Sequence, residues 1–202
     1  MAHSRNQNQT IIKMQYNILL PKNPVQNPPL LIMLHGYGSD EKDLFSFAET
    51  LNDRFLVVSL RAPKKLPWGG YAWYDIDFTG SSSRFGNPEQ ALDSLQKVDA
   101  FIAEIVLRYN TNPQETVLLG FSQGAILAYA LAMNHPQKYK RIVAFSGYIF
   151  KEIMPSEIKK EDASSLDIFG SHGVVDEIIP VAWARNSQEW LKSNHIKCEY
   201  HE

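Results

Sequence analysis

Short runs of apolar residues, separated by longer polar or periodic stretches, set the pattern of this chain. The runs are continuous and do not alternate with polar residues, which is typical of strands buried on both faces of a parallel sheet. The more mixed segment 11–20 favours an edge strand, and further strands are predicted at 166–169 and at about 197–200. The continuous apolar runs cover residues 30–34, 55–58, 117–119 and 142–145.

The clearest helical pattern begins at Asn87. Asn87 can cap the helix, Pro88 suits its first position, and Gln90 follows three residues after the cap. Apolar residues then recur at spacings of three and four, which predicts one buried stripe. The stripe consists of Leu92, Leu95, Val98, Ile102, Ile105 and Tyr109.

Two more helices are predicted, over about 123–134 and about 180–192. The first must stop before His135 and Pro136, because a residue that precedes proline is disfavoured in helical conformation. Strands that alternate with helices of this length indicate right-handed βαβ units. We therefore expect a single α/β domain over residues 1–202, with a mostly parallel central sheet and helices on both faces. Residues 61–87 are interpreted as a long irregular insertion, a kind of segment that tends to carry function.

Composition and charge exclude several classes of protein. Apolar residues make up 44% and charged residues 21% of the 202 residues, and the net charge of −2 gives no sign of a nucleic-acid surface. The lone Cys198 allows neither an internal disulfide nor a cysteine metal cluster. The polar first ten residues do not read as a signal peptide, and no apolar stretch is long enough for a membrane helix, so a cytoplasmic protein is expected.

A candidate nucleophile lies between a buried run and a helix. Gly120, Ser122 and Gly124 match G-x-S-x-G in that context, where a very tight turn would expose the serine hydroxyl and the glycines would remove clashes. The N–H of Gln123 then points at the same space from the start of the helix. The alternative is a glycine-flanked strand–helix turn of a Rossmann-like protein that contains serine by chance.

Two other loops supply candidate partners. In the loop 34–40 the N–H of Tyr37 is our candidate for the second oxyanion donor, whereas His35 is interpreted as a brace of the loop. Asp176 lies in a loop after the strand predicted at 166–169 and follows the nucleophile, as the acid of such a triad should. Alternatively, Asp176 caps the next helix, and Glu177 is a weaker competitor. Asp75 and Asp77 precede Ser122 and are disfavoured by order.

Together these segments resemble the phospholipase/carboxylesterase family, the α/β-hydrolase branch that includes the acyl-protein thioesterases. The resemblance implies an α/β-hydrolase fold without a cofactor, with Ser122 as nucleophile, Asp176 as the residue that orients the base, and Tyr37 and Gln123 as oxyanion donors. It also implies that Trp73 contacts substrate, although a core aromatic is nearly as good an interpretation. The matching motifs are LHGYGSDEKDL (34–44), RAP (61–63), WYDI (73–76), GFSQGA (120–125), FSGY (145–148) and HGVVDEIIP (172–180).

The general base is where the resemblance fails. Of the six histidines, only His195 and His201 follow Asp176. His195 precedes the last strand, about 17 Å from the correct end of the sheet if that strand has five residues. In the family the base follows this strand in a loop and precedes a closing helix. We therefore expect the base beyond Glu202, so that the chain is truncated at its C-terminus and one face of the sheet is left uncovered. The alternative is that His201 serves as the base.

The expected function is hydrolysis of carboxylic esters, of the carboxylesterase, lysophospholipase or acyl thioesterase type, through a Ser-His-Asp triad and an acyl-enzyme. The expected partner is a small-molecule ester or acyl substrate, without metal or nucleic acid. The alternative is a ligand-binding protein of the same fold that lacks the base. Acyl-chain length, ester or thioester preference and oligomeric state stay open.

Overall fold

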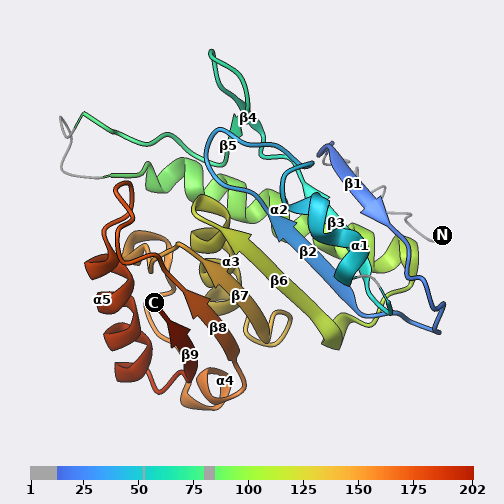
Figure 1. Cartoon of the computed structure of the whole chain (residues 1–202). Helices are drawn as coiled ribbons and strands as arrows, with labels where there is room; N and C mark the ends of the chain where they lie inside the picture. Colours follow the sequence, from blue (N-terminus) through green and yellow to red (C-terminus); the bar gives the residue numbers. More distant parts are fainter. Residues whose placement is uncertain (1–12, 52, 80–84) are drawn as a thin grey trace, which may run out of the picture.

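The computed structural model describes residues 13–51, 53–79 and 85–202, and its centre is one seven-stranded sheet (Figure 1). The strand order is β1-β3-β2-β6-β7-β8-β9, in which β1 pairs antiparallel with β3 and all the other pairs are parallel. The predicted mostly parallel sheet with an N-terminal edge strand is therefore confirmed. The strands are β1 (Tyr16–Leu19), β2 (Leu30–Leu34), β3 (Leu56–Leu60), β6 (Thr116–Phe121), β7 (Arg141–Phe145), β8 (Asp167–Ser171) and β9 (Cys198–His201).

Helices lie on both faces of the sheet, as predicted. The long helices α2, α3 and α5 pack on one face over the main apolar core, and the short α1 lies over β2 and β3 on the other (Figure 1). The α-helices are α1 (Ala48–Leu51), α2 (Pro88–Tyr109), α3 (Gln123–Asn134), α4 (Lys160–Ser164) and α5 (Val181–Ser193). Short 3-10 turns occupy Leu44–Phe47, Pro113–Glu115 and Lys151–Ile153.

The prediction of strands buried on both faces holds for only part of the sheet. Every residue of β2 and β3 is buried, whereas buried and half-exposed residues alternate along β6 and β7. On the alternating face, Phe121 is 42% exposed. No helix among the described residues packs over the β7–β9 part of that face, so its apolar side chains keep contact with solvent.

Helix α2 begins as the sequence predicts, since the side chain of Asn87 accepts a hydrogen bond from the N–H of Gln90 and Pro88 takes the first position. Its buried stripe differs from the prediction at one end. Leu92 is 38% exposed, while Ala91, one position earlier, is fully buried. A position one residue away is rotated by about 100° around the helix, so only one of the two can face the core.

The described part of the predicted insertion, residues 61–79 and 85–87, is less irregular than predicted. It contains the antiparallel pair β4 (Lys64–Lys65) and β5 (Tyr71–Ala72). The pair is fastened to the rest of the molecule because Gly38 donates to Tyr71 O and Tyr71 donates to Ser39 O. In the part of the chain that the structure describes, no helix combines the length and the apolar character needed to span a membrane.

Candidate active site

Ser122 lies in the turn between β6 and α3, at the carboxyl end of the sheet (Figure 1). Its backbone angles, φ 53° and ψ −119°, belong to a region that residues with a side chain rarely adopt. The helix starts at the next residue, Gln123, and ends at Asn134, as the sequence predicts. The strained residue is therefore the candidate nucleophile itself, which is the geometry expected of a nucleophile elbow.

The glycines around Ser122 are required by contacts with backbone. A Cβ atom on Gly120 would lie 2.4 Å from the carbonyl group of Gly124. A Cβ on Gly124 would lie 1.9 Å from Leu34 O, and one on Gly36 would lie 3.0 Å from the Phe121 ring. At Gly120 and Gly124 the backbone thus approaches more closely than any side chain permits, and the close approach of Gly124 to Leu34 brings the loop after β2 next to the serine.

The two residues predicted to supply the oxyanion donors, Tyr37 and Gln123, line the same pocket as Ser122. Neither the N–H of Tyr37 nor that of Gln123 donates to a backbone carbonyl among the described residues. Gln123 is the first residue of α3, where the helix leaves its N–H groups without a partner inside the helix. Within the described ranges, both groups therefore remain available to an anionic oxygen.

The side chain of Gln123 fixes the start of α3 through two hydrogen bonds to the backbone of residues 73 and 74. Its amide oxygen accepts from the N–H of Trp73 at 3.0 Å, and its amide nitrogen donates to Tyr74 O at 2.7 Å. The Trp73 indole, which is 1% exposed, donates to His35 O at 2.8 Å. Trp73 is absent from the lining of the Ser122 pocket. The structure thus favours the core interpretation of Trp73, with a contact to the site through Gln123 and not through the pocket.

His35 is a brace between loops, as interpreted from the sequence. Its Nδ1 donates to Gly36 O at 2.7 Å, and its Nε2 accepts from the N–H of Ala62 at 3.0 Å. Burial lowers the pKa of the imidazole, so the ring stays neutral and serves as donor on one side and acceptor on the other. With both nitrogens engaged, His35 cannot take a proton from Ser122.

Asp176 faces the same pocket from the loop between β8 and α5, whereas Glu177 is exposed outside it. One carboxylate oxygen, Oδ1, accepts from the N–H groups of Ile178 and Ile179, both at 2.9 Å. His172 ties the loop further, since its Nε2 donates to Ile179 O at 2.8 Å and lies 3.6 Å from Asp176 Oδ2. The Asp176 side chain is 20% exposed and lies in the lining of the pocket.

Successive strand ends are joined by backbone hydrogen bonds around the site. Ser122 N–H donates to Phe145 O at 2.9 Å, and Ser146 N–H donates to Ser171 O at 2.8 Å. His172 N–H then donates to His201 O at 3.0 Å. The turns that carry Ser122, Ser146 and Asp176 are in this way held to one another in order across the sheet.

The pocket beside Ser122 has a volume of about 320 Å³. Ser146 lies in its lining with a positive φ of 51°. Ser146 was not singled out from the sequence, although its place directly after a buried strand was a usable signal. The apolar wall, most of which was also not predicted, is made by Ile76, Phe78, Phe85, Ile126, Ile178 and Ile179.

None of the described histidines lines this pocket. His195 lies in the turn before β9, at the far end of that strand, as predicted. His201 is the last residue of β9, where its Nε2 donates to Glu199 Oε1 at 2.9 Å and its ring lies 5.5 Å from that of Phe169. The described residues therefore bring Ser122, Asp176 and two free N–H groups together without an imidazole between them.

Comparison with known proteins extends these observations. A family model described as phospholipase/carboxylesterase matches residues 15–202. A probable inactive carboxylesterase of Oryza sativa subsp. japonica is 28% identical over 131 residues, which are 64% of this chain and 53% of that protein. The chain thus aligns with about half of the length of this relative.

Two further proteins are similar over most of their length. Acyl-protein thioesterase 1 of Kluyveromyces lactis is 29% identical over 196 residues, with 88% of this chain and 81% of that protein covered. The crystal structure of esterase PE8 superposes with a TM-score of 0.76 at 26% identity, covering 94% of this chain and 88% of that chain. The sheet order, the turn at Ser122 and the match over residues 15–202 together show that this chain belongs to the phospholipase/carboxylesterase family of α/β-hydrolases.

Proposed function

We propose that the protein is a serine hydrolase of carboxylic esters, of the carboxylesterase, lysophospholipase or acyl thioesterase type. The observation that carries the proposal is Ser122, held at φ 53° in a pocket that also contains Asp176. A strained backbone at a pocket residue is costly, by about 1–3 kcal/mol, and such strain clusters at active sites. Membership of a family of hydrolases supports the same assignment.

In the proposed reaction Ser122 Oγ attacks the carbonyl carbon of the ester while a base removes its proton. The N–H groups of Tyr37 and Gln123 stabilise the negative oxygen of the tetrahedral intermediate, a contribution worth about 10²–10³ in rate for each donor. The intermediate collapses to an acyl-enzyme as the alcohol or thiol departs with the proton, and water then releases the acid. Asp176, through Oδ2, holds the base in the productive tautomer.

We assign the base to the loop after β9, where the family resemblance places it, with His201 as the second candidate. This assignment can be tested on the chain itself, because free imidazole can replace a missing general base. We expect p-nitrophenyl acetate hydrolysis by the 1–202 chain to be slow and to rise at least tenfold with added imidazole, above the background of Ser122→Ala in the same buffer. Fast turnover without imidazole that His201→Gln abolishes would make His201 the base.

A ligand-binding protein without turnover is the second candidate function. It is favoured by one observation, the lack of an imidazole in the described lining of the pocket. The rice relative carries a name that calls it a probable inactive carboxylesterase. Labelling with a fluorophosphonate separates the two functions. If Ser122 resists the reagent with and without imidazole, and no ester is hydrolysed in either condition, the hydrolase proposal is wrong.

A further inference from the structure

The last residue of the oxyanion loop, which we define as residues 36–41, is a buried carboxylate. The side chain of Glu41 is only 6% exposed, and a glutamate is rarely so buried without a partner. Its partner is Arg61, the first residue after β3, whose side chain is 22% exposed. Neither residue lines the Ser122 pocket, so the pair cannot touch a substrate held there.

Arg61 binds Glu41 with both prongs of its guanidinium. Its Nε donates to Oε2 at 2.5 Å and its Nη2 donates to Oε1 at 2.6 Å. These hydrogen bonds lower the pKa of Glu41, so the carboxylate stays charged at neutral pH. The third nitrogen of Arg61, Nη1, donates to Tyr71 Oη at 3.1 Å, and the guanidinium lies over the Tyr71 ring, 4.5 Å from its centroid. One planar group thus connects the carboxylate to β5, which a lysine could not do.

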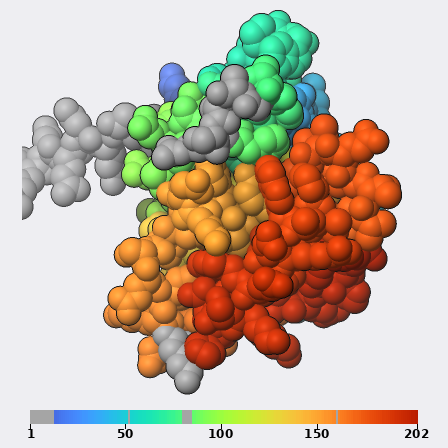
Figure 2. Space-filling view, turned by 90° about the vertical axis from the view of Figure 1, so that its left-hand side faces the viewer, coloured from blue at the N-terminus to red at the C-terminus, as the bar shows by residue number. Residues whose placement is uncertain are grey.

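Tyr71 in turn holds the middle of the oxyanion loop by backbone hydrogen bonds. The N–H of Gly38 donates to Tyr71 O at 2.9 Å, and the N–H of Tyr71 donates to Ser39 O at 2.8 Å. The two segments touch, since a Cβ on Gly70 would lie 1.9 Å from Gly38 O. The β4–β5 pair projects from the rest of the molecule (Figure 2), and these bonds join the oxyanion loop to it.

The catalytic importance of the loop lies in one peptide group, the one between Gly36 and Tyr37. In a trans peptide the N–H points away from the carbonyl of the same plane, so the direction of Gly36 O sets the direction of the Tyr37 N–H. Gly36 O accepts from His35 Nδ1 at 2.7 Å and from the N–H of Ser39 at 3.3 Å. The predicted oxyanion donor is therefore aimed by two groups that hold the opposite side of its peptide.

These two groups are supported in different ways. His35 is held by its hydrogen bond to the N–H of Ala62. Ser39 is held by Tyr71, and the loop that contains it ends two residues later at Glu41. Arg61 contacts both Tyr71 and Glu41, so a single guanidinium fixes Ser39 from two sides.

We propose that Glu41 and Arg61 are positioning residues of the oxyanion hole, and that their ion pair keeps the Tyr37 N–H aimed at the tetrahedral intermediate. The inference rests on the proposed function, in which Tyr37 supplies an oxyanion donor. Negative charge develops on the carbonyl oxygen only towards the transition state, so a misdirected donor costs rate more than substrate binding. Acylation and deacylation both pass through an oxyanion, so both slow together and KM stays nearly constant.

The test uses Glu41→Gln, which keeps the size of the side chain and removes its charge. With p-nitrophenyl acetate at a fixed imidazole concentration, above the Ser122→Ala background, we expect kcat to fall about tenfold and KM to change less than about twofold. Asp99→Asn is the matched control, because Asp99 is also partly buried and binds Lys138 and Tyr139 outside the pocket. The control should lower Tm and leave kcat within about twofold.

Binding of phenylboronic acid gives a second readout that needs no turnover. Its boron bonds to Ser122 Oγ as the hydroxyl proton leaves to the buffer, and the tetrahedral adduct places an oxygen at the oxyanion donors. We expect its Kd to rise about tenfold in Glu41→Gln and to stay within about twofold in Asp99→Asn. Arg61→Lys keeps the charge without the fork, so its kcat should fall less than that of Arg61→Met.

The outcomes separate the inference from the proposed function. If Glu41→Gln lowers Tm but leaves kcat and the boronate Kd unchanged, the pair is merely structural and the inference is overturned. Equal losses of kcat in Asp99→Asn, or a rise in KM in place of the fall in kcat, overturn it as well. Should Glu41→Gln not fold, Arg61→Lys decides by the same split between kcat and KM. If the parent chain neither hydrolyses the ester nor binds the boronate, the proposed function itself fails.

Discussion

The two proposed catalytic side chains are positioned by different physical means. In the elbow region, which we define as residues 34–36 and 120–124, backbone touches backbone, and only glycine fits at positions 120 and 124. In the aspartate loop, residues 172–179, the fold depends on hydrogen bonds to the Asp176 carboxylate and from the His172 ring. The nucleophile is thus fixed by steric exclusion, and the acid by polar contacts.

This difference predicts which substitutions destabilise each of the two regions. Steric exclusion tolerates no added atom but is insensitive to charge, whereas a loop tied by a carboxylate depends on the ionisation and geometry of a few groups. Substitutions of equal size should therefore have unequal effects in the two regions.

The largest effect is expected for Gly124→Ala. The new Cβ would lie 1.9 Å from Leu34 O, so β2 and α3 must separate, at a cost of about 3 kcal/mol or more in the free energy of unfolding. Gly173→Ala in the aspartate loop is the matched control, because nothing lies within 4 Å of its Cβ. Urea unfolding of both variants checks the comparison, which breaks down if the two differ by less than 1 kcal/mol, a threshold of about the size of an ordinary mutational effect.

Asp176→Ala should come next, with a loss of about 2 kcal/mol. Two backbone N–H groups lose a charged acceptor, and the side chain is only partly exposed. Asp176→Asn keeps an acceptor oxygen at Oδ1 and should lose about half as much. Equal losses for both variants by urea unfolding would show that charge, and not the capping of Ile178 and Ile179, holds the loop.

The elbow region should also make stability depend on pH through His35. Burial lowers the pKa of this imidazole below its ordinary value of 6.5, so the unfolded chain takes up a proton at a higher pH than the folded one. Stability is therefore lost as pH falls below 6.5 towards the pKa of the folded state, and stays level above 6.5.

The measurement is the change in Tm between pH 7 and pH 5 for His35→Asn and for the control His195→Asn, whose histidine is exposed. We expect a smaller acid loss in His35→Asn than in the parent chain, and no difference in the control. An identical acid loss in all three proteins would contradict a buried neutral His35.

The smallest effect, a gain, is expected for Ser122→Gly. Glycine adopts the angles of Ser122 without strain, and after its larger unfolded-state entropy is allowed for, about 1 kcal/mol of stability should remain. Ser122→Ala keeps the strain and should show no such gain. If alanine and glycine stabilise equally in thermal unfolding, the hydroxyl and not the backbone carries the cost.

The sequence predicted best where one local rule decides the structure. Helix α3 and the turn at Ser122 follow from two glycines and from the proline after His135, and the start of α2 follows from Asn87 and Pro88. The prediction was less accurate where contacts with a segment distant in sequence determine the structure. Periodicity placed Leu92 on the buried stripe, but Ala91 is the buried residue, which no local pattern distinguishes.

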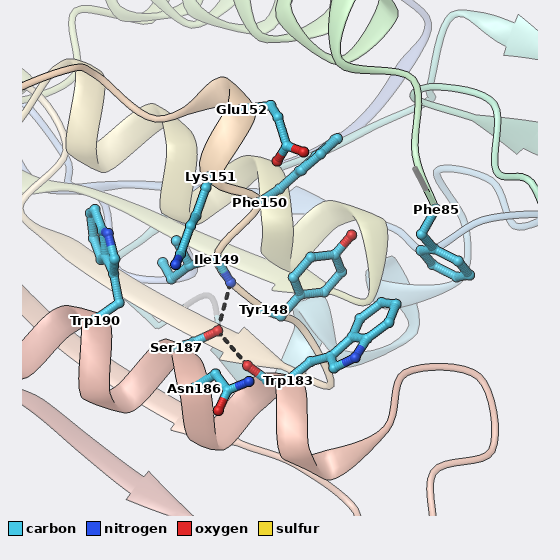
Figure 3. A pocket seen from close by; sticks show the side chains of 10 residues that line it. All are labelled: Phe85, Tyr148, Ile149, Phe150, Lys151, Glu152, Trp183, Asn186, Ser187 and Trp190. Atoms are coloured by element: carbon cyan, nitrogen blue, oxygen red, sulfur yellow. Dashed lines mark hydrogen bonds between the residues drawn. The ribbon is translucent and has the colours of Figure 1, made fainter. Parts of the chain in front are cut away.

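The surroundings of the site were hardest to predict for the same reason. Trp73 could have lined a pocket or the core, and only the positions of Gln123 and His35 decide for the core. The pocket between α5 and the segment 148–152 combines aromatic rings from residues 85, 148, 150, 183 and 190, which meet only in the folded molecule (Figure 3). No window of the sequence contains that information.

The hydrogen bonds between successive strand ends have a consequence for how the molecule loosens. Ser122 N–H is protected by β7, Ser146 N–H by β8, and His172 N–H by the edge strand β9. Edge elements open at lower free energy than central ones. Amide exchange should therefore begin at His172, pass to Ser146 and reach Ser122 last, so that the Asp176 turn is the first part of the site to loosen and the nucleophile the last.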